Sequence, residues 1–166
     1  LIMDTAVELT GAERGFLLLA DATGSLGVVT ARDFEHATPS DPHAQFSRTI
    51  AESVFIDGEP VITTSAQDDA RFNEFMSVHQ LRLESVLCIP IRARDKVIGV
   101  LYMENRVRRG RFGEQDERLL VSFGDQVAIA IENARLLREN VDRQEQLATA
   151  NQQLSEAKRE IEEVLA

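Results

Sequence analysis

The chain has 166 residues, 43% of them hydrophobic, which suits one domain with a substantial core plus an appendage. Eighteen Lys and Arg stand against 28 Asp and Glu, a formal net charge of -10, so we expect no direct nucleic-acid partner and no anionic membrane surface as partner. No apolar run approaches the roughly 20 residues that cross a bilayer, which excludes a membrane-spanning helix.

The first third of the sequence predicts a helix, a hairpin and a loop. Apolar residues at helical spacing (Ile2, Ala6, Val7 and Leu9) predict a helix over 1–10 that ends at Gly11. Two apolar runs around a turn at Asp21 to Gly24 then predict a β-hairpin. The stretch HATPSDPHAQ, residues 36–45, has two prolines and no periodicity, which predicts an exposed loop.

The middle of the sequence predicts one helix and three strands. Ser47 is a good N-cap for a helix that Gly58 ends, and the β-branched run in 60–66 predicts a strand. A polar loop with one or two helical turns follows over 67–83. Two strands, 85–92 and 96–104, then form a second hairpin.

From Glu114 to Ala166 there is no Pro and only one Gly, so one helix of about 50 residues is expected. Its first part carries a wide apolar stripe that fits a sheet, made of Leu119, Leu120, Phe123, Val127, Ala130, Ile131, Ala134 and Leu137. Beyond Val141, Leu147, Leu154 and Ile161 recur every seven residues, which is typical of a coiled-coil seam and predicts a parallel homodimer. A single solvated helix is the alternative, because polar residues share the seam.

Candidate catalytic and metal residues are few. A nucleophilic active site would combine Cys88 with His79 and Asp68. However, Cys88 lies between strand-forming apolar residues, where a thiol packs as a small hydrophobic side chain. His36, His43 and His79 lack the close spacing of a zinc motif. We therefore expect no enzyme activity and no metal site.

Four segments carry a family resemblance: GAERGFLLL, GEPVITT, LESVLCIPIRARDKVIGVLYMEN and the stretch from Phe123 to Leu137. In this order and spacing they resemble a bacterial GAF domain over about residues 1–140. The chain is also similar to the family's asparagine, basic, phenylalanine, aspartate and glutamate motif, present as Asn105, Arg106, Phe112, Asp116 and Glu117. In the family a basic-to-acidic pair ties the loop to the helix, so the resemblance implies a clasp between Arg106 and Asp116.

The resemblance implies an α/β (α+β) fold: a central antiparallel sheet flanked by helices, with a long C-terminal helix. We expect a sensory domain over 1–140 and a coiled-coil signalling helix over 141–166. The chain starts without Met and stops within a charged helical run, which suggests a piece of a longer cytoplasmic protein with a fused downstream effector. The implied effector is a histidine kinase, an ATP-driven transcription activator or a nucleotide cyclase.

The expected function is small-molecule sensing, and the alternative is a ligand-free dimerisation module whose pocket is filled by side chains. Methionine-sulfoxide reduction, known in small relatives, is disfavoured by a lone buried cysteine and the long helix. The ligand is unknown; the resemblance admits a cyclic nucleotide or another small metabolite. We expect no bilin, because Cys88 is followed by Ile89 and Pro90 within a strand, and no haem, because neither His36 nor His43 is a strong axial ligand.

Candidate ligand-binding residues lie where the long helix does not cover the sheet. They are Thr49 on the predicted second helix, Asp68, Arg71, Phe72 and Asn73 in the polar loop, and Ser85 and Tyr102 on the sheet. Alternation places Val100, Tyr102 and Glu104 on one face of their strand and Leu101 and Met103 on the other. The sequence does not decide which face meets the ligand.

Overall fold

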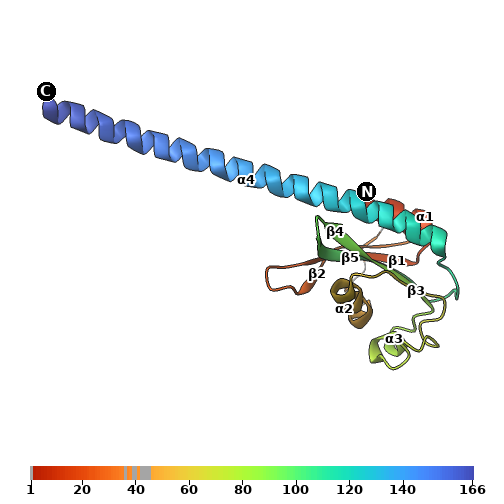
Figure 1. Ribbon diagram of the computed structural model, residues 1–166. Helices are drawn as coiled ribbons and strands as arrows, with labels where there is room; N and C mark the ends of the chain where they lie inside the picture. Colours follow the sequence, from red (N-terminus) through yellow and green to blue (C-terminus); the bar gives the residue numbers. More distant parts are fainter. Residues whose placement is uncertain (1, 36, 39–40, 42–45) are drawn as a thin grey trace. The chain divides into compact units, whose positions relative to one another are not determined.

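The computed structural model describes residues 2–35, 37–38, 41 and 46–166 (Figure 1). The elements in chain order are α1 (Ile2–Thr10), β1 (Arg14–Ala20), β2 (Leu26–Asp33), α2 (Arg48–Asp57), β3 (Val61–Thr63), α3 (Met76–Gln80), β4 (Ser85–Ala93), β5 (Lys96–Asn105) and α4 (Glu114–Leu165). The predicted loop over 36–45 falls mostly outside the described residues. His36 and His43 are among the residues that lie outside the described ranges.

The strands form one antiparallel sheet in the order β2-β1-β5-β4-β3. Both predicted hairpins are present: Asp21 closes the first by accepting the N–H groups of Thr23 and Ser25, and β4 with β5 forms the second. The central strand is β5, and its pairing with β1 joins residues about 90 positions apart in the chain, such as Arg14 and Glu104. The predicted fold class, an antiparallel sheet with flanking helices and a long C-terminal helix, is confirmed.

One sheet face packs against α2 and the segment that contains α3. Ser47 caps α2 as predicted, with its side chain accepting from the Ile50 N–H, and Gly58 ends the helix in the left-handed conformation. The buried residues of this layer come from every strand, from α2 and α3 and from the loops: Phe16, Leu18, Leu26, Ala31, Phe46, Ile50, Val54, Val61, Phe72, Val78, Leu83, Val86, Cys88, Val100 and Tyr102. We call this side of the sheet the α2 face. In Figure 1 it is opposite α1.

The other face, which we call the α1 face, is covered by α1 and by the first part of α4. Small residues allow the close approach: a Cβ built on Gly15 would lie 2.7 Å from the Met103 sulfur and 2.8 Å from a Val7 methyl group. A Cβ on Gly124 of α4 would lie 2.8 Å from Ile89 Cδ1. The helices therefore sit directly on Leu87, Ile89, Leu101 and Met103, all of which are fully buried.

The buried side of α1 differs from the prediction. Met3, Ala6, Val7 and Thr10 face the sheet, whereas Ile2 and Leu9 are 40% and 55% exposed. The predicted stripe joined Ile2 and Leu9 to Ala6 and Val7, but a 3.6-residue period places Met3 and Thr10 on the same side instead. The sheet-facing side of α4 likewise includes Gly124 and Ala128 besides the predicted Leu120 and Val127.

The chain divides into two compact units, Leu1–Ile129 and Ala130–Ala166. The second unit is the continuous helical remainder of α4, and Leu147, Leu154 and Ile161 are each more than half exposed there. In the part of the chain that the structure describes, no helix is both long and apolar enough to cross a membrane.

Candidate functional site

The chemically unusual part of the α2 face is the end of β5, where Tyr102 and Glu104 lie in an otherwise apolar strand. Both side chains are fully buried. The antiparallel register places Phe16 of β1 beside Tyr102, and Arg14 beside Glu104. Alternation along β5 directs Leu101 and Met103 to the α1 face. Tyr102 and Glu104 therefore share the α2 face.

Glu104 is a buried carboxylate between two arginines. Its Oε1 atom accepts from Arg106 Nε and Nη2, each at 2.9 Å, and lies 3.7 Å from Arg14 Nη1. Burial raises the pKa of Glu104 to about 7, although Arg106 and Arg14 act in the opposite direction. Desolvation of the charged form therefore outweighs the attraction of both guanidinium groups.

Two atoms of this cluster lack hydrogen-bond partners. Glu104 Oε2 and Arg14 Nη1 are both buried and make no hydrogen bond, although Arg14 Nη1 lies within ion-pair distance of Glu104 Oε1, at 3.7 Å. A buried polar group left without a partner costs about 1–3 kcal/mol, so a bound group that satisfies both would gain a similar amount. Glu104 Oε2 can accept a hydrogen bond, or donate one when the carboxyl group is protonated. Arg14 Nη1 can donate one.

Tyr102 belongs to a triangle of aromatic rings next to this cluster. Its ring centroid is 5.9 Å from those of Phe16 and Phe46, and these two are 5.5 Å apart. The Tyr102 hydroxyl accepts the Ser47 N–H at 3.2 Å, which ties the sheet to the start of α2. Burial, followed by the neighbouring Glu104 charge, raises the pKa of Tyr102, so the phenol stays protonated.

The segment before α3 covers the α2 face and is held by ion pairs. Arg71 Nε and Nη2 contact the two Asp69 oxygens at 3.0 and 2.8 Å, and Nη2 also donates to the Ile62 carbonyl at 3.0 Å. The hydrogen bond from Arg71 lowers the pKa of Asp69 to about 2. The Arg71 guanidinium lies 4.9 Å from the Phe72 ring centroid, and Phe72 is buried in the core.

The predicted ligand residues fall into different environments. Phe72 and Tyr102 share the core of the α2 face, whereas Thr49 and Asn73 are exposed. Asp68 pairs with Arg109 Nη1 at 2.9 Å, and Ser85 Oγ donates to the Arg108 carbonyl at 2.8 Å. Alternation places Ser85 on the side opposite Val86, away from Tyr102.

The family motif organises the connection between β5 and α4. Asn105 Oδ1 accepts the N–H groups of Val107 and Arg108, and Asp116 Oδ2 accepts the Gly113 N–H at 2.9 Å, as in a capping box. Phe112 is buried. The Arg106 guanidinium contacts Glu104, two residues before it, and the clasp with Asp116 stays a prediction.

Sequence reasoning missed Arg14, Phe16, Phe46 and Glu104 as members of this site. The signal for Glu104 was present, because it is the one acid within the strand run KVIGVLYMEN. Arg14 could be assigned only from the pairing of β1 with β5.

Cys88 packs in the core of the α2 face as predicted. It is fully buried, and burial raises the pKa of its thiol. Within the described ranges, no group of three or more His, Cys, Asp or Glu side chains is arranged to hold a metal ion.

Comparison with known proteins defines the family. The model of the GAF domain matches residues 1–131, and the chain belongs to this family. GAF domains are generally regulatory, which supports a sensory signalling domain. The chain is 30% identical over 148 residues to the probable 3',5'-cyclic phosphodiesterase pde-5 of Caenorhabditis elegans, covering 81% of this chain. It spans only 20% of that relative's length.

Solved structures share the fold. A photoproduct-state GAF domain from Synechocystis aligns with a TM-score of 0.69 at 14% identity, over 83% of this chain and 93% of its own. Part of a methyl-accepting chemotaxis protein aligns with a TM-score of 0.61 at 24% identity, over 82% of this chain and 87% of its own. The cyanobacteriochrome TePixJ GAF domain aligns with a TM-score of 0.64 at 14% identity, over 81% of this chain and 87% of its own.

The sequence-based exclusion of a bilin ligand is wrong. Several of the structural neighbours are cyanobacteriochromes, light-absorbing members with the same fold. The exclusion depended on the position of Cys88 alone, whereas the capacity to enclose a chromophore depends on the whole fold. The position of one cysteine therefore does not settle the ligand class.

Proposed function

We propose that this chain is the input domain of a bacterial signalling protein, that it senses a small molecule on the α2 face, and that α4 passes its state to an effector. The observation that supports the proposal is that two buried atoms, Glu104 Oε2 and Arg14 Nη1, make no hydrogen bond beside an aromatic triangle. A planar molecule with one donor and one acceptor would satisfy both atoms while its ring replaces contacts of Phe46.

The path from the site to α4 is short. Tyr102 and Glu104 alternate along β5 with Leu101 and Met103, which lie under α1 and the first part of α4. A displacement of β5 by a ligand therefore acts on both faces. A ligand can shift the equilibrium between two states only by binding them unequally.

The effector is a signalling enzyme or a transcription activator that works as a dimer. A histidine kinase, an ATP-driven transcription activator and a nucleotide cyclase are the candidates. The relative pde-5 is named as a phosphodiesterase, and one solved neighbour is a domain of a putative two-component sensor histidine kinase from Sinorhizobium meliloti, with 18% identity and a TM-score of 0.60. These names support signalling as the context. The cytoplasm as the compartment is a further part of the proposal.

In this proposal the chain forms a parallel homodimer through α4, in which three residues pair with their copies in the second chain: Leu147, Leu154 and Ile161. The dimer brings two effectors together. Sedimentation of the 166-residue chain tests it, with a version that ends at Leu137 as the comparison. A dimer that becomes monomeric on shortening supports association through the helix. A monomer at full length contradicts the dimer.

The test of sensing is a thermal-shift screen with cyclic nucleotides, a bilin and common metabolites. A ligand at a hundredfold excess over its dissociation constant adds about 2.7 kcal/mol of stability. We expect a compound that raises the melting temperature of the wild-type chain and has less effect on Glu104→Gln. Equal shifts in both proteins would place the ligand elsewhere.

A ligand-free dimerisation module is the second candidate function. The packing of Phe16, Phe46 and Tyr102 favours it, because the three rings already occupy the interior. A screen without any hit, together with a stable dimer, would support this alternative.

A further inference from the structure

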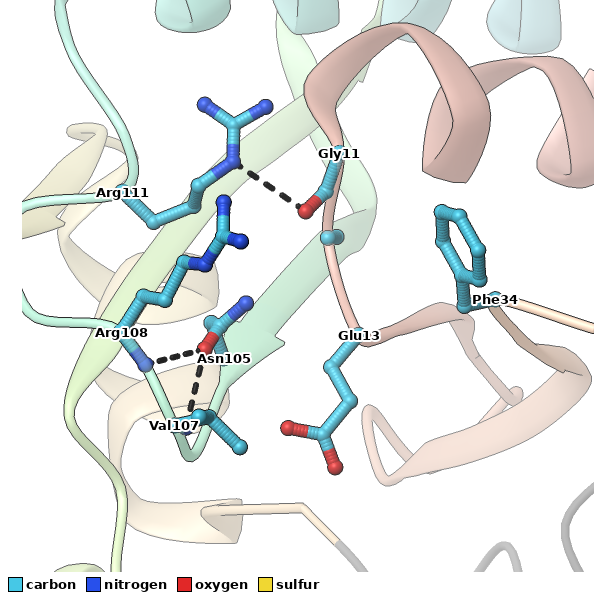
Figure 2. Close-up of a pocket in the computed structure, with 8 residues that line it drawn as sticks. Gly11, Glu13, Phe34, Asn105, Val107, Arg108 and Arg111 are labelled. Carbon is cyan, nitrogen blue, oxygen red and sulfur yellow. Dashed lines mark hydrogen bonds between the residues drawn. The ribbon is translucent and has the colours of Figure 1, made fainter.

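A hollow lies at the end of the sheet (Figure 2). It has a volume of about 410 Å³, within the range of small-molecule pockets. Its lining comes from the turn after α1, the end of β2 and the loop after β5: Gly11, Ala12, Glu13, Phe34, Asn105, Val107, Arg108 and Arg111. We call it the basic groove.

The backbone of the loop beside the groove is fixed. The Arg108 N–H donates to Asn105 Oδ1 at 2.6 Å, and the Arg108 carbonyl accepts from Ser85 Oγ at 2.8 Å. Ser85 Oγ also accepts the Arg111 N–H at 3.2 Å, and Gly110 N–H donates to the Thr64 carbonyl at 2.8 Å. The position from which Arg108 projects is therefore set before any ligand arrives, which lowers the cost of binding.

The four arginines of this loop differ in what their guanidinium groups contact. Arg106 contacts Glu104, and Arg109 contacts Glu84 at 2.7 Å and Asp68 at 2.9 Å. Arg111 Nε donates to the Gly11 carbonyl at 3.2 Å, a neutral partner. Among the residues that the structure describes, the Arg108 guanidinium has no hydrogen bond or ion pair.

The acid in the groove is already engaged. Glu13 Oε2 accepts the Arg106 N–H at 3.0 Å, and Glu13 Oε1 lies 3.8 Å from Arg14 Nη2. The charges of Arg108 and Arg111 are therefore not neutralised from within the groove. This is the reverse of the chain as a whole, whose net charge is -10.

The groove also has an apolar wall. Phe34 and Val107 line it and are 65% and 81% exposed. Phe34 is held by its N–H, which donates to the Glu13 carbonyl at 3.0 Å. In Figure 2 the side chains of Arg108 and Arg111 extend from one side of the Gly11–Glu13 segment, and Phe34 lies on the other side.

We propose that the basic groove binds a small aromatic anion, a molecule that joins one phosphate or carboxylate to a planar ring. The anionic group contacts the Arg108 and Arg111 guanidinium groups, and the ring packs on Phe34 and Val107. A guanidinium donates two parallel hydrogen bonds to such an oxyanion. This site is separate from the sensing interior and is independent of the proposed function.

Binding of 1-naphthyl phosphate to the full chain, measured by calorimetry, tests the proposal, with 1-naphthoate as the carboxylate arm and inorganic phosphate as the ring-free arm. Arg108→Gln should weaken 1-naphthyl phosphate about tenfold or more, because a hydrogen bond to a charged group is lost. Phe34→Ala should weaken it about threefold to tenfold and leave inorganic phosphate unchanged. Comparing the two naphthyl compounds identifies which oxyanion the groove prefers.

The matched control is Arg109→Gln, which removes the same charge from the same loop but a guanidinium that contacts Asp68 and Glu84. It should leave the affinity within about twofold, since an exposed charge outside the site acts only through a screened field. Three results overturn the proposal: no saturable binding of either naphthyl compound, equal losses in Arg108→Gln and Arg109→Gln, or no effect of Phe34→Ala.

Discussion

The two faces of the sheet are built from the same strands but differ in chemistry. The α1 face has Leu87, Ile89, Leu101 and Met103 packed directly under helices, with glycines at the contacts. The α2 face has an aromatic triangle, a buried carboxylate and two buried atoms without hydrogen bonds. The first face is organised for stability, whereas the second keeps polar groups whose burial has a cost. Because buried polar groups without hydrogen bonds are exceptions within a core, we propose the α2 face as the one that recognises a ligand.

The largest effect is expected on the α1 face. Leu101→Ala should lower the free energy of unfolding by about 2–5 kcal/mol, because a fully buried leucine leaves a cavity under α1 and α4. Urea unfolding measures the loss. Leu9→Ala in α1 is the control, since Leu9 is 55% exposed and should change stability by about 0.5 kcal/mol or less. Equal losses would contradict the assignment of the buried side.

The pH dependence of stability should depend on Glu104. Its pKa is raised from 4.5 to about 7 in the folded chain, so the folded state binds the proton more tightly than the unfolded state. Its contribution is therefore fully present below pH 4.5 and is lost as the pH rises towards 7, by up to about 3 kcal/mol.

Glu104→Gln should flatten that decline, because an amide does not titrate. Urea unfolding between pH 4.5 and pH 8 compares the two proteins. If wild type and variant lose stability in parallel over this window, Glu104 is not the buried acid that the α2 face requires.

The smallest effect concerns the segment that covers the α2 face. Arg71→Ala should cost at most about 1 kcal/mol at neutral pH, since Arg71 is 56% exposed. The pKa of Asp69, about 2 beside Arg71, should return towards 3.8, so acid unfolding would begin at a higher pH. Arg118→Ala, in an exposed helical pair with Glu114, is the control. An unchanged acid midpoint in Arg71→Ala would show that the pair does not hold this segment.

The individual elements were predictable because their signals are local: the cap at Ser47, the turn at Asp21 and the alternation in β5 each determine an element. The arrangement of the elements into one fold was predicted from the family resemblance. The site was less predictable. Arg14 and Glu104 are adjacent only through strand pairing, and Phe46 reaches Tyr102 only because α2 begins where it does. Alternation separated Tyr102 from Leu101. The face that each occupies became clear only from the close contacts between helices and sheet at Gly15 of β1 and Gly124 of α4.

The central claim is that the α2 face binds a ligand and that β5 carries the effect to the α1 face. The methionine methyl groups report it directly: a Cβ on Gly15 would meet both Met103 and Met3 on the α1 face, whereas Met76 in α3 is 71% exposed. We would record methyl NMR spectra of [¹³C-methyl]methionine-labelled chain with the compound that raises the melting temperature most in the screen. The account predicts shifts of the Met103 and Met3 signals in the wild-type chain and smaller ones in Glu104→Gln. A bound compound that leaves both signals in place, or moves them equally in the two proteins, would contradict it.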